Sequence, residues 1–107
     1  MKQKYICIIW NAGDKKEAES IARDLVEKKA VACVNIFPVI ESIYMWEGAL
    51  QHEKETHVVM KTRGDLFETV QRYINEKARY DLSEVIAYEI TQGSEGYLSW
   101  IDDALTS

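Results

Sequence analysis

One stretch of sequence decides the fold of this chain: AVACVNIFP at residues 30–38, which continues through SIYMWEG at 42–48 to MKT at 60–62. β-Branched and aromatic residues, which favour strands, lie on both sides of a Glu-Gly pair that suits a tight turn. The stretch predicts one long β-hairpin, with arms from Val31 to Trp46 and from Ala49 to Thr62. Pro38 lacks an amide donor, so it predicts a bulge or bend in the first arm.

This hairpin is too long for the body that the rest of the chain can build. At ~3.3 Å per residue, an arm from Ala49 to Thr62 reaches roughly 46 Å. A compact 100-residue domain has a radius of gyration of only ~13 Å. The overhanging part would expose strand edges and the apolar side chains of residues 43–46, which invite aggregation unless another subunit covers them. We therefore expect the chain to assemble with copies of itself.

Strand and helix signals alternate on both sides of the hairpin. A nearly continuous apolar run at residues 6–10 predicts a central strand, and Asp14 with Glu17 has the spacing of a capping box that opens a helix. Apolar residues then recur with helical periodicity between positions 18 and 26. After the hairpin, Asp65 with Glu68 repeats the capping-box spacing and predicts the start of a second helix.

The last predicted strand covers residues 85–90, and a C-terminal helix is expected to start at Gly93-Ser94. The order strand, helix, strand, strand, helix, strand gives an antiparallel four-stranded sheet with both internal helices on one face. The fold class is therefore α+β: a ferredoxin-like βαββαβ unit with a long hairpin between the second and third strands and a C-terminal helix. The bare sheet face and the hairpin are the surfaces that a trimer or dimer would cover.

The composition narrows the class of protein. A chain of 107 residues predicts a single domain over 1–107, and no apolar run approaches the ~20 residues that a membrane span needs. A formal net charge of −5 argues against nucleic acid or an anionic membrane as the main partner, because both attract basic surfaces. The N-terminus runs into the first strand without an apolar signal segment, so we expect a cytoplasmic protein.

Metal-ligating residue types are present, but their spacing defines no site. The only two histidines, His52 and His57, are five residues apart and would point to opposite faces of a strand. Cys7 and Cys33 lack the spacing of a zinc site, and we expect them to be buried free thiols. Glutamates gather around the hairpin, where they can either solubilise strand edges or hold a hard divalent cation weakly: Glu41, Glu47, Glu53 and Glu55.

Patterns of nucleophilic catalysis are missing, because the sequence has no GxSxG, no local Cys–His pair and no phosphate-binding glycine loop. One constellation of aromatic and charged residues remains near the predicted strand ends: Tyr44, Trp46, Lys61, Tyr80, Asp81, Glu84 and Trp100. If the hairpins of several subunits pack together, these residues can line a small-ligand cleft between subunits. The same residue types are also enriched in ordinary subunit interfaces, so both interpretations stay open.

Several short motifs together resemble the CutA divalent-cation-tolerance family. In chain order they are ACVNI at 32–36, SIY at 42–44, WEG at 46–48, KT at 61–62, EVI at 84–86, GS at 93–94 and YLSW at 97–100. The resemblance implies a ferredoxin-like fold that assembles into a tight homotrimer through its long hairpins, similar in plan to the PII signalling proteins. It also implies a cytoplasmic protein linked to tolerance of divalent metal ions, with copper binding in some members.

The positions that resemblance would assign to copper ligands carry other residues here. Copper-binding relatives have a cysteine at the position of Trp10, and the family segment His-Pro-Tyr-Glu-x-Pro-Glu matches ARYDLSE at residues 78–84. The thiol and imidazole groups that bind soft or borderline metals are therefore absent from both places. The metal ligands stay unassigned, Cu²⁺ is the divalent cation to test, and no other cofactor is expected.

Three functions are compatible with these observations. The first is a trimeric binding or regulatory module associated with tolerance to divalent metal ions. The second is a PII-like sensor that binds a small anionic or aromatic ligand in the cleft between subunits. The third is an enzyme that uses Lys61 and Glu84, although no base–nucleophile pair can be assembled from the sequence. We expect a protein that is not an enzyme.

Overall fold

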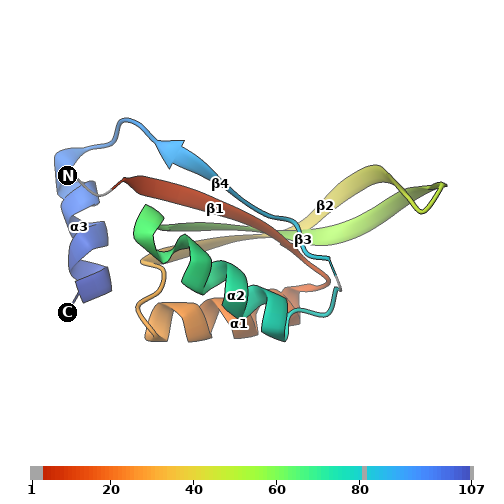
Figure 1. Cartoon of the computed structure of the whole chain (residues 1–107), viewed down its shortest axis with the longest axis horizontal. Helices are drawn as coiled ribbons and strands as arrows, with labels where there is room; N and C mark the ends of the chain where they lie inside the picture. The colour runs from red at the N-terminus through yellow and green to blue at the C-terminus, as the bar shows by residue number, and fades with distance from the viewer. Residues whose placement is uncertain (1–3, 81, 107) are drawn as a thin grey trace.

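The computed structural model describes residues 4–80 and 82–106 of the chain. Within these residues, four strands form one antiparallel sheet in the order β2-β3-β1-β4 (Figure 1). The strands and helices have these bounds: β1 Tyr5–Ala12, α1 Lys15–Glu27, β2 Cys33–Trp46, β3 Ala49–Arg63, α2 Phe67–Lys77, β4 Val85–Ile90 and α3 Glu95–Thr106. Helices α1 and α2 cover one face of the sheet, and α3 lies at the end opposite the hairpin tip (Figure 1). The ferredoxin-like α+β fold predicted from the sequence is confirmed.

The long hairpin is present, and its local chemistry explains its shape. Both tip residues have positive φ, 49° at Glu47 and 81° at Gly48, as a two-residue turn between strands requires. The register of β2 on β3 shifts between Phe37 and Ile40, which confirms the bulge predicted at Pro38. The Thr56 hydroxyl donates a hydrogen bond of 3.0 Å to the Pro38 carbonyl at this bulge. The chain measures 45 Å along its longest axis, and the hairpin extends beyond the sheet's other strands (Figure 1).

Alternation along the strands separates the two faces of the sheet. Alternate β3 residues from Thr56 to Thr62 are buried, and the Trp10 side chain of β1 is fully buried on the same face. These side chains pack against the apolar faces of α1 and α2, including Leu25 and Ile74. The opposite face carries the intervening residues of β1 and β3, which are mostly half-buried because neither α1 nor α2 covers them.

The helix starts agree only in part with the capping patterns in the sequence. Asp14 accepts a hydrogen bond of 2.8 Å from the Glu17 amide and caps α1 as predicted. The prediction for Asp65 was wrong: residues 64–66 form a 3₁₀ turn, and α2 begins at Phe67 without a side-chain cap. The Asp65 carboxylate instead pairs with the Arg63 guanidinium, with Nε and Oδ1 3.2 Å apart, so a nearby cation competes with the helix end for this acid.

Helix α3 is attached to the sheet by polar and apolar contacts. The Tyr5 hydroxyl of β1 donates a hydrogen bond of 2.6 Å to Asp102, and the guanidinium of Arg63 lies 3.6 Å from the same carboxylate. Ile101 and Leu105 are buried against Ala32, in a second, smaller apolar cluster. The C-terminal helix is therefore fixed at the sheet end that lies far from the hairpin tip (Figure 1).

A hydrogen bond between α1 and α2 predicts how stability changes at alkaline pH. The Tyr73 hydroxyl donates to the Asp24 carboxylate, and this bond raises the pKa of Tyr73 to about 12. A tyrosine in the unfolded chain has a pKa of about 10. The stabilisation is therefore complete below pH 10 and is lost as pH rises through 12, because the unfolded state releases its proton first. We expect the difference in unfolding free energy between the wild type and Tyr73→Phe, measured in urea, to shrink between pH 9 and 12. A difference that stays constant across this range would contradict the assignment.

Candidate functional site

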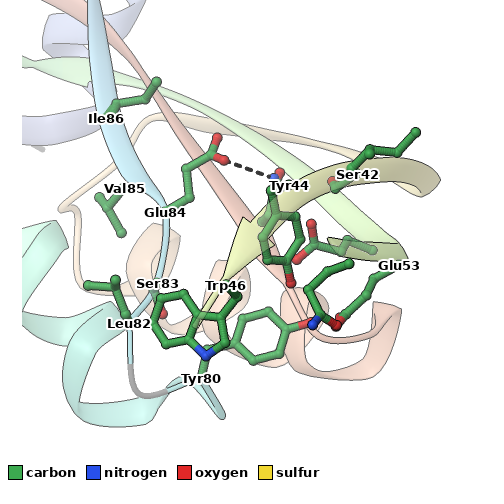
Figure 2. Close-up of a pocket in the computed structure, with 14 residues that line it drawn as sticks. Ser42, Tyr44, Trp46, Glu53, Tyr80, Leu82, Ser83, Glu84, Val85 and Ile86 are labelled. Atoms are coloured by element: carbon green, nitrogen blue, oxygen red, sulfur yellow. Dashed lines mark hydrogen bonds between the residues drawn. The ribbon is translucent and has the colours of Figure 1, made fainter. Parts of the chain in front are cut away.

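A pocket of about 920 Å³ lies beside the hairpin, between β2, β3 and the segment that leads from α2 into β4 (Figure 2). Its volume is at the upper end of the range for small-molecule sites. Three aromatic side chains form walls, namely Tyr44, Trp46 and Tyr80. Three carboxylates also line it, from Glu53, Glu55 and Glu84. Walls of this kind, with a few charged groups, are typical of small-ligand pockets.

The hairpin supplies its share of the pocket through strand alternation and register. Alternate residues of β2, including Tyr44 and Trp46, face the pocket because successive side chains of a strand point to opposite faces. Tyr44 lies opposite Gln51 in the β2–β3 register, and Ser42 lies opposite Glu53. A directly opposed pair shares one face of the sheet, so the two arms bring aromatic and acidic groups together.

The start of α1 holds the segment that carries Tyr80. One oxygen of the Glu17 carboxylate accepts the Gly13 amide at 3.0 Å, and the other accepts the Arg79 amide at 2.8 Å. The Arg79 guanidinium also lies 2.8 Å from the Asp14 carboxylate. A Cβ at Gly13 would lie 2.6 Å from Nη2 of Arg79, so the absence of a side chain there lets the guanidinium approach. These bonds fix the backbone next to Tyr80 against α1.

A buried asparagine orients the acid at the other side of the pocket. Asn11 is 7% exposed, and its amide nitrogen donates to a Glu84 oxygen at 3.3 Å. The dashed line from Glu84 in Figure 2 marks this bond. The Asn11 carbonyl oxygen lies 2.6 Å from Nδ1 of His57. An amide oxygen can only accept, so we assign the proton of this bond to the His57 Nδ1. The chain of hydrogen bonds from His57 through Asn11 directs the Glu84 carboxylate.

The electrostatic field of the pocket is negative. Burial raises the pKa of Tyr80, and the carboxylates of Glu55 and Glu53 raise it further. Burial also raises the pKa of Tyr44, with an added contribution from Glu53. Among the described lining residues there is no lysine, arginine or histidine. Both tyrosines are therefore protonated donors at neutral pH, in a pocket whose charged groups are acids.

The structure brings together four of the seven residues that we proposed for a ligand cleft. Tyr44, Trp46, Tyr80 and Glu84 all line the pocket. Lys61 lies near the C-terminal end of β3, where its ammonium donates to the Asn35 side chain. Trp100 belongs to α3, where it stacks on Tyr97 at a centroid distance of 5.6 Å, and it is not part of the described pocket lining. Asp81 falls outside the described residues.

Sequence reasoning did not place three polar residues in this pocket. The sequence predicts Glu53 and Glu55 as hairpin acids that either solubilise strand edges or hold a hard divalent cation weakly, and it singles out no role for Asn11. Cross-strand pairing of the predicted hairpin was the signal that could have joined the two acids to Tyr44. No local signal pointed to Asn11, because its role depends on contacts with residues 46 and 73 positions away.

The third function considered from the sequence, an enzyme, needs Lys61 close to Glu84. The strand registers offset these residues by about four positions, which is roughly 13 Å along the strand direction at ~3.3 Å per residue. Lys61 is also absent from the described lining of the pocket. Within one chain, the two residues do not form a catalytic pair.

Candidate metal ligands do not converge in the described parts of the chain. Over residues 4–80 and 82–106, no group of three or more His, Cys, Asp or Glu side chains is arranged to hold a metal ion. His52 pairs with Glu41, with 2.7 Å between Nε2 and Oε1. Both cysteines are free and half-buried rather than fully buried. Cys7 of β1 and Cys33 of β2 both pair with Lys61 of β3. Strand β3 therefore lies between the two thiols.

No helix in the described residues is both long enough and apolar enough to cross a membrane.

Comparison with known proteins was made for the sequence and for the fold. Residues 6–104 match the family model described as CutA1 divalent ion tolerance protein. The chain is 41% identical over 91 residues to the chloroplastic protein CutA of Arabidopsis thaliana, which covers 85% of this chain and 50% of that protein. It is 39% identical over 90 residues to the divalent-cation tolerance protein CutA of Archaeoglobus fulgidus, covering 84% and 87%. The chain spans about half the length of several curated relatives that it matches.

Solved structures of two similar proteins share the fold along almost their whole length. The periplasmic divalent cation tolerance protein CutA from A. fulgidus superposes with a TM-score of 0.92 at 36% identity, covering 94% of this chain and 98% of that one. CutA1 from Oryza sativa gives a TM-score of 0.91 at 34% identity, covering 94% and 93%. The extent of the family match, together with these identities, shows that the chain belongs to the CutA1 divalent ion tolerance protein family.

Proposed function

We propose that this chain forms a homotrimeric, cytoplasmic binding module in the response to divalent metal ions, and that its pocket binds a small regulatory ligand. The observation that carries the proposal is the pocket itself, in which aromatic walls from the hairpin and from Tyr80 surround a set of carboxylates. The names of the relatives support the link to divalent ions. Two free thiols without a disulfide agree with a reducing compartment.

The exposed surface of the single chain supports assembly. Ile43 is 66% exposed, Met45 63% and Leu50 70%, all near the hairpin tip. The sheet face without α1 and α2 adds Tyr88, which is 61% exposed. Contiguous apolar surface of this kind marks a protein–protein contact, because solvent exposure of it promotes aggregation. A trimer built through the hairpins, as the family resemblance implies, would cover both regions.

Binding is favoured over catalysis and over direct copper coordination. Ser42 and Ser83 line the pocket beside its acids, but the Ser83 hydroxyl has no hydrogen-bond partner among the described residues and no described hydrogen bond joins Ser42 to a carboxylate, so no activated nucleophile is formed there. Copper binding needs thiol or imidazole ligands, and the described residues bring no such cluster together. We infer that the family's link to metal ions operates in this chain through a small-molecule signal rather than through a bound metal ion.

The test combines assembly state with ligand binding by the full chain. Sedimentation velocity at micromolar concentration should give a trimer. Thermal unfolding in the presence of a panel of nucleotides, metabolites, amines and metal salts should show a saturable rise in melting temperature with an organic ligand. Trp46→Ala should abolish that rise and leave the trimer intact. A monomer, or a rise with Cu²⁺ or Zn²⁺ alone at about 100 μM, a concentration chosen from affinity arithmetic, would contradict the proposal.

A further inference from the structure

The charges of the pocket are unbalanced. Glu53, Glu55 and Glu84 give it a formal charge of −3, and no lysine, arginine or histidine belongs to its described lining. Like charges that face a shared cavity repel one another, and low-dielectric walls strengthen that repulsion. Aromatic rings provide such walls on two sides of this cavity. The pocket is therefore complementary to a positive charge and poorly suited to an anionic ligand.

One of these carboxylates is deeply buried. Glu55 is only 8% exposed, although it lies on the hairpin where most neighbours face solvent. No lysine, arginine or histidine nitrogen of the described residues lies within 4.0 Å of its oxygens, because no ion pair of Glu55 is found there. A carboxylate that is buried without a cation has lost hydration that a positively charged partner would compensate. Its contact with the Tyr80 hydroxyl supplies one donor but no charge.

Two further features of the pocket indicate what kind of cation would pair with Glu55. Trp46, Tyr44 and Tyr80 present ring surfaces to the cavity, and such rings attract alkylammonium groups more strongly when water is excluded. The Ser83 hydroxyl, which also lines the cavity, is buried and has no hydrogen-bond partner among the described residues. An N–H donor of a ligand would satisfy this oxygen. The cavity combines hydrogen-bond acceptors, carboxylates and aromatic rings. A cation that has both N–H groups and methylene groups would be complementary to all three.

The size of the cavity argues against a metal ion as that cation. A divalent ion needs several oxygen ligands within about 2.0–2.6 Å. The carboxylates here are dispersed, since no group of three acidic, histidine or cysteine side chains in the described residues is close enough to hold an ion. A cavity of about 920 Å³ would leave a bare ion mostly in water. An elongated organic cation can reach separate carboxylates and fill the space between them.

We propose that the ligand of this pocket is a short aliphatic polyamine, whose ammonium groups pair with Glu53, Glu55 and Glu84 while its methylene chain packs against Trp46, Tyr44 and Tyr80. The proposal rests on the proposed function, because it assigns a chemical class to the same pocket. An arginine or lysine side chain from a second copy of the chain would meet the same field. The experiment below distinguishes these two sources of positive charge.

Spermidine is the probe, because it carries three ammonium groups at neutral pH. Isothermal titration of the full chain at 0.15 M salt should give saturable binding with one spermidine per chain. The neutral diol 1,8-octanediol, which keeps a comparable chain length, should not bind, and Mg²⁺ at equal charge should not displace spermidine. Glu55→Gln removes one charge at nearly constant volume and should weaken spermidine binding at least tenfold. Glu41→Gln, at the exposed acid that pairs with His52, should leave the affinity unchanged.

Several outcomes would overturn the polyamine assignment. Spermidine fails to bind a folded chain, the diol binds equally well, or Mg²⁺ displaces spermidine as an ordinary screening ion would. Retention of full affinity in both Glu55→Gln and Glu53→Gln also rejects it, and the second variant guards against misfolding of the first. A crystal structure of the assembly with a partner's arginine or lysine in the pocket would assign the charge to the protein itself. If an anionic or neutral ligand binds and only Trp46→Ala abolishes its binding, the proposed function survives without the polyamine.

Discussion

Replacing Trp10 with alanine is expected to lower the free energy of unfolding by about 3–5 kcal/mol, the range for deleting a large buried aromatic side chain. The indole is fully buried, and it packs between the sheet and the helices α1 and α2. Small domains have only about 5–15 kcal/mol of total stability, so this single change removes a large part of it. Urea unfolding followed by circular dichroism measures the effect as a shift in the midpoint.

The matched control at the same position is Trp10→Phe. The indole nitrogen has no hydrogen-bond partner among the described residues, and a buried donor without a partner costs about 1–3 kcal/mol. Phenylalanine removes that donor while it keeps most of the aromatic packing, so the two effects oppose each other. We expect Trp10→Phe to cost less than half as much as Trp10→Ala. Equal losses in the two variants would show that the indole nitrogen does have a partner.

The double variant Met45→Lys with Leu50→Glu is expected to dissociate the assembly. These residues lie directly opposite each other near the hairpin tip, and both are more than 60% exposed in the single chain. Burial of such a side chain in an interface contributes about 1.5–3 kcal/mol. Loss of two per subunit should therefore weaken association at least ~100-fold, since 1.4 kcal/mol corresponds to a factor of ten. Sedimentation velocity at micromolar concentration should show a smaller species.

The choice of opposite charges separates assembly from folding. A lysine facing a glutamate across two strands keeps a favourable pair, so the hairpin itself should survive. Val26→Lys on α1, whose side chain is 41% exposed, places a charge on the helix layer and should leave the oligomer unchanged. A double variant that sediments like the wild type would show that the tip of the hairpin lies outside the interface. A monomeric wild type would remove the basis for the trimer.

The hairpin could be predicted because its signals are local. Gly48 adopts the positive φ of a tight turn without strain, and Pro38 lacks the amide that strand pairing requires. The alternation of apolar residues in strands and their 3.6-residue periodicity in helices then predict which face of each element is buried. The Asp65 prediction failed although the competing partner is local. The capping-box spacing considers only the helix end, whereas the carboxylate pairs with the Arg63 guanidinium two residues before it.

The candidate site was predicted in part. Tyr44, Trp46, Tyr80 and Glu84 drew attention as aromatic and charged residues near strand ends, and all four line one pocket. The charge of the pocket differs from the prediction. The sensor hypothesis considered an anionic or aromatic ligand, whereas the charged groups that line the pocket are carboxylates. Glu55 made the difference, since a glutamate in an acidic stretch is usually solvated, and only the tertiary structure shows that this one is 8% exposed.

By itself, the sequence determined the order of strands and helices, the length of the hairpin and the faces that each element buries. These properties follow from backbone preferences and from periodicity, which act over a few residues. The tertiary structure decided which side chains share a cavity, which acid is buried, and which hydrogen bonds of Asn11 and Glu17 hold the walls in place. Those outcomes depend on contacts between residues that lie far apart in the chain. Because alternative contacts of this kind have comparable free energies, no local sequence pattern predicts which of them will form.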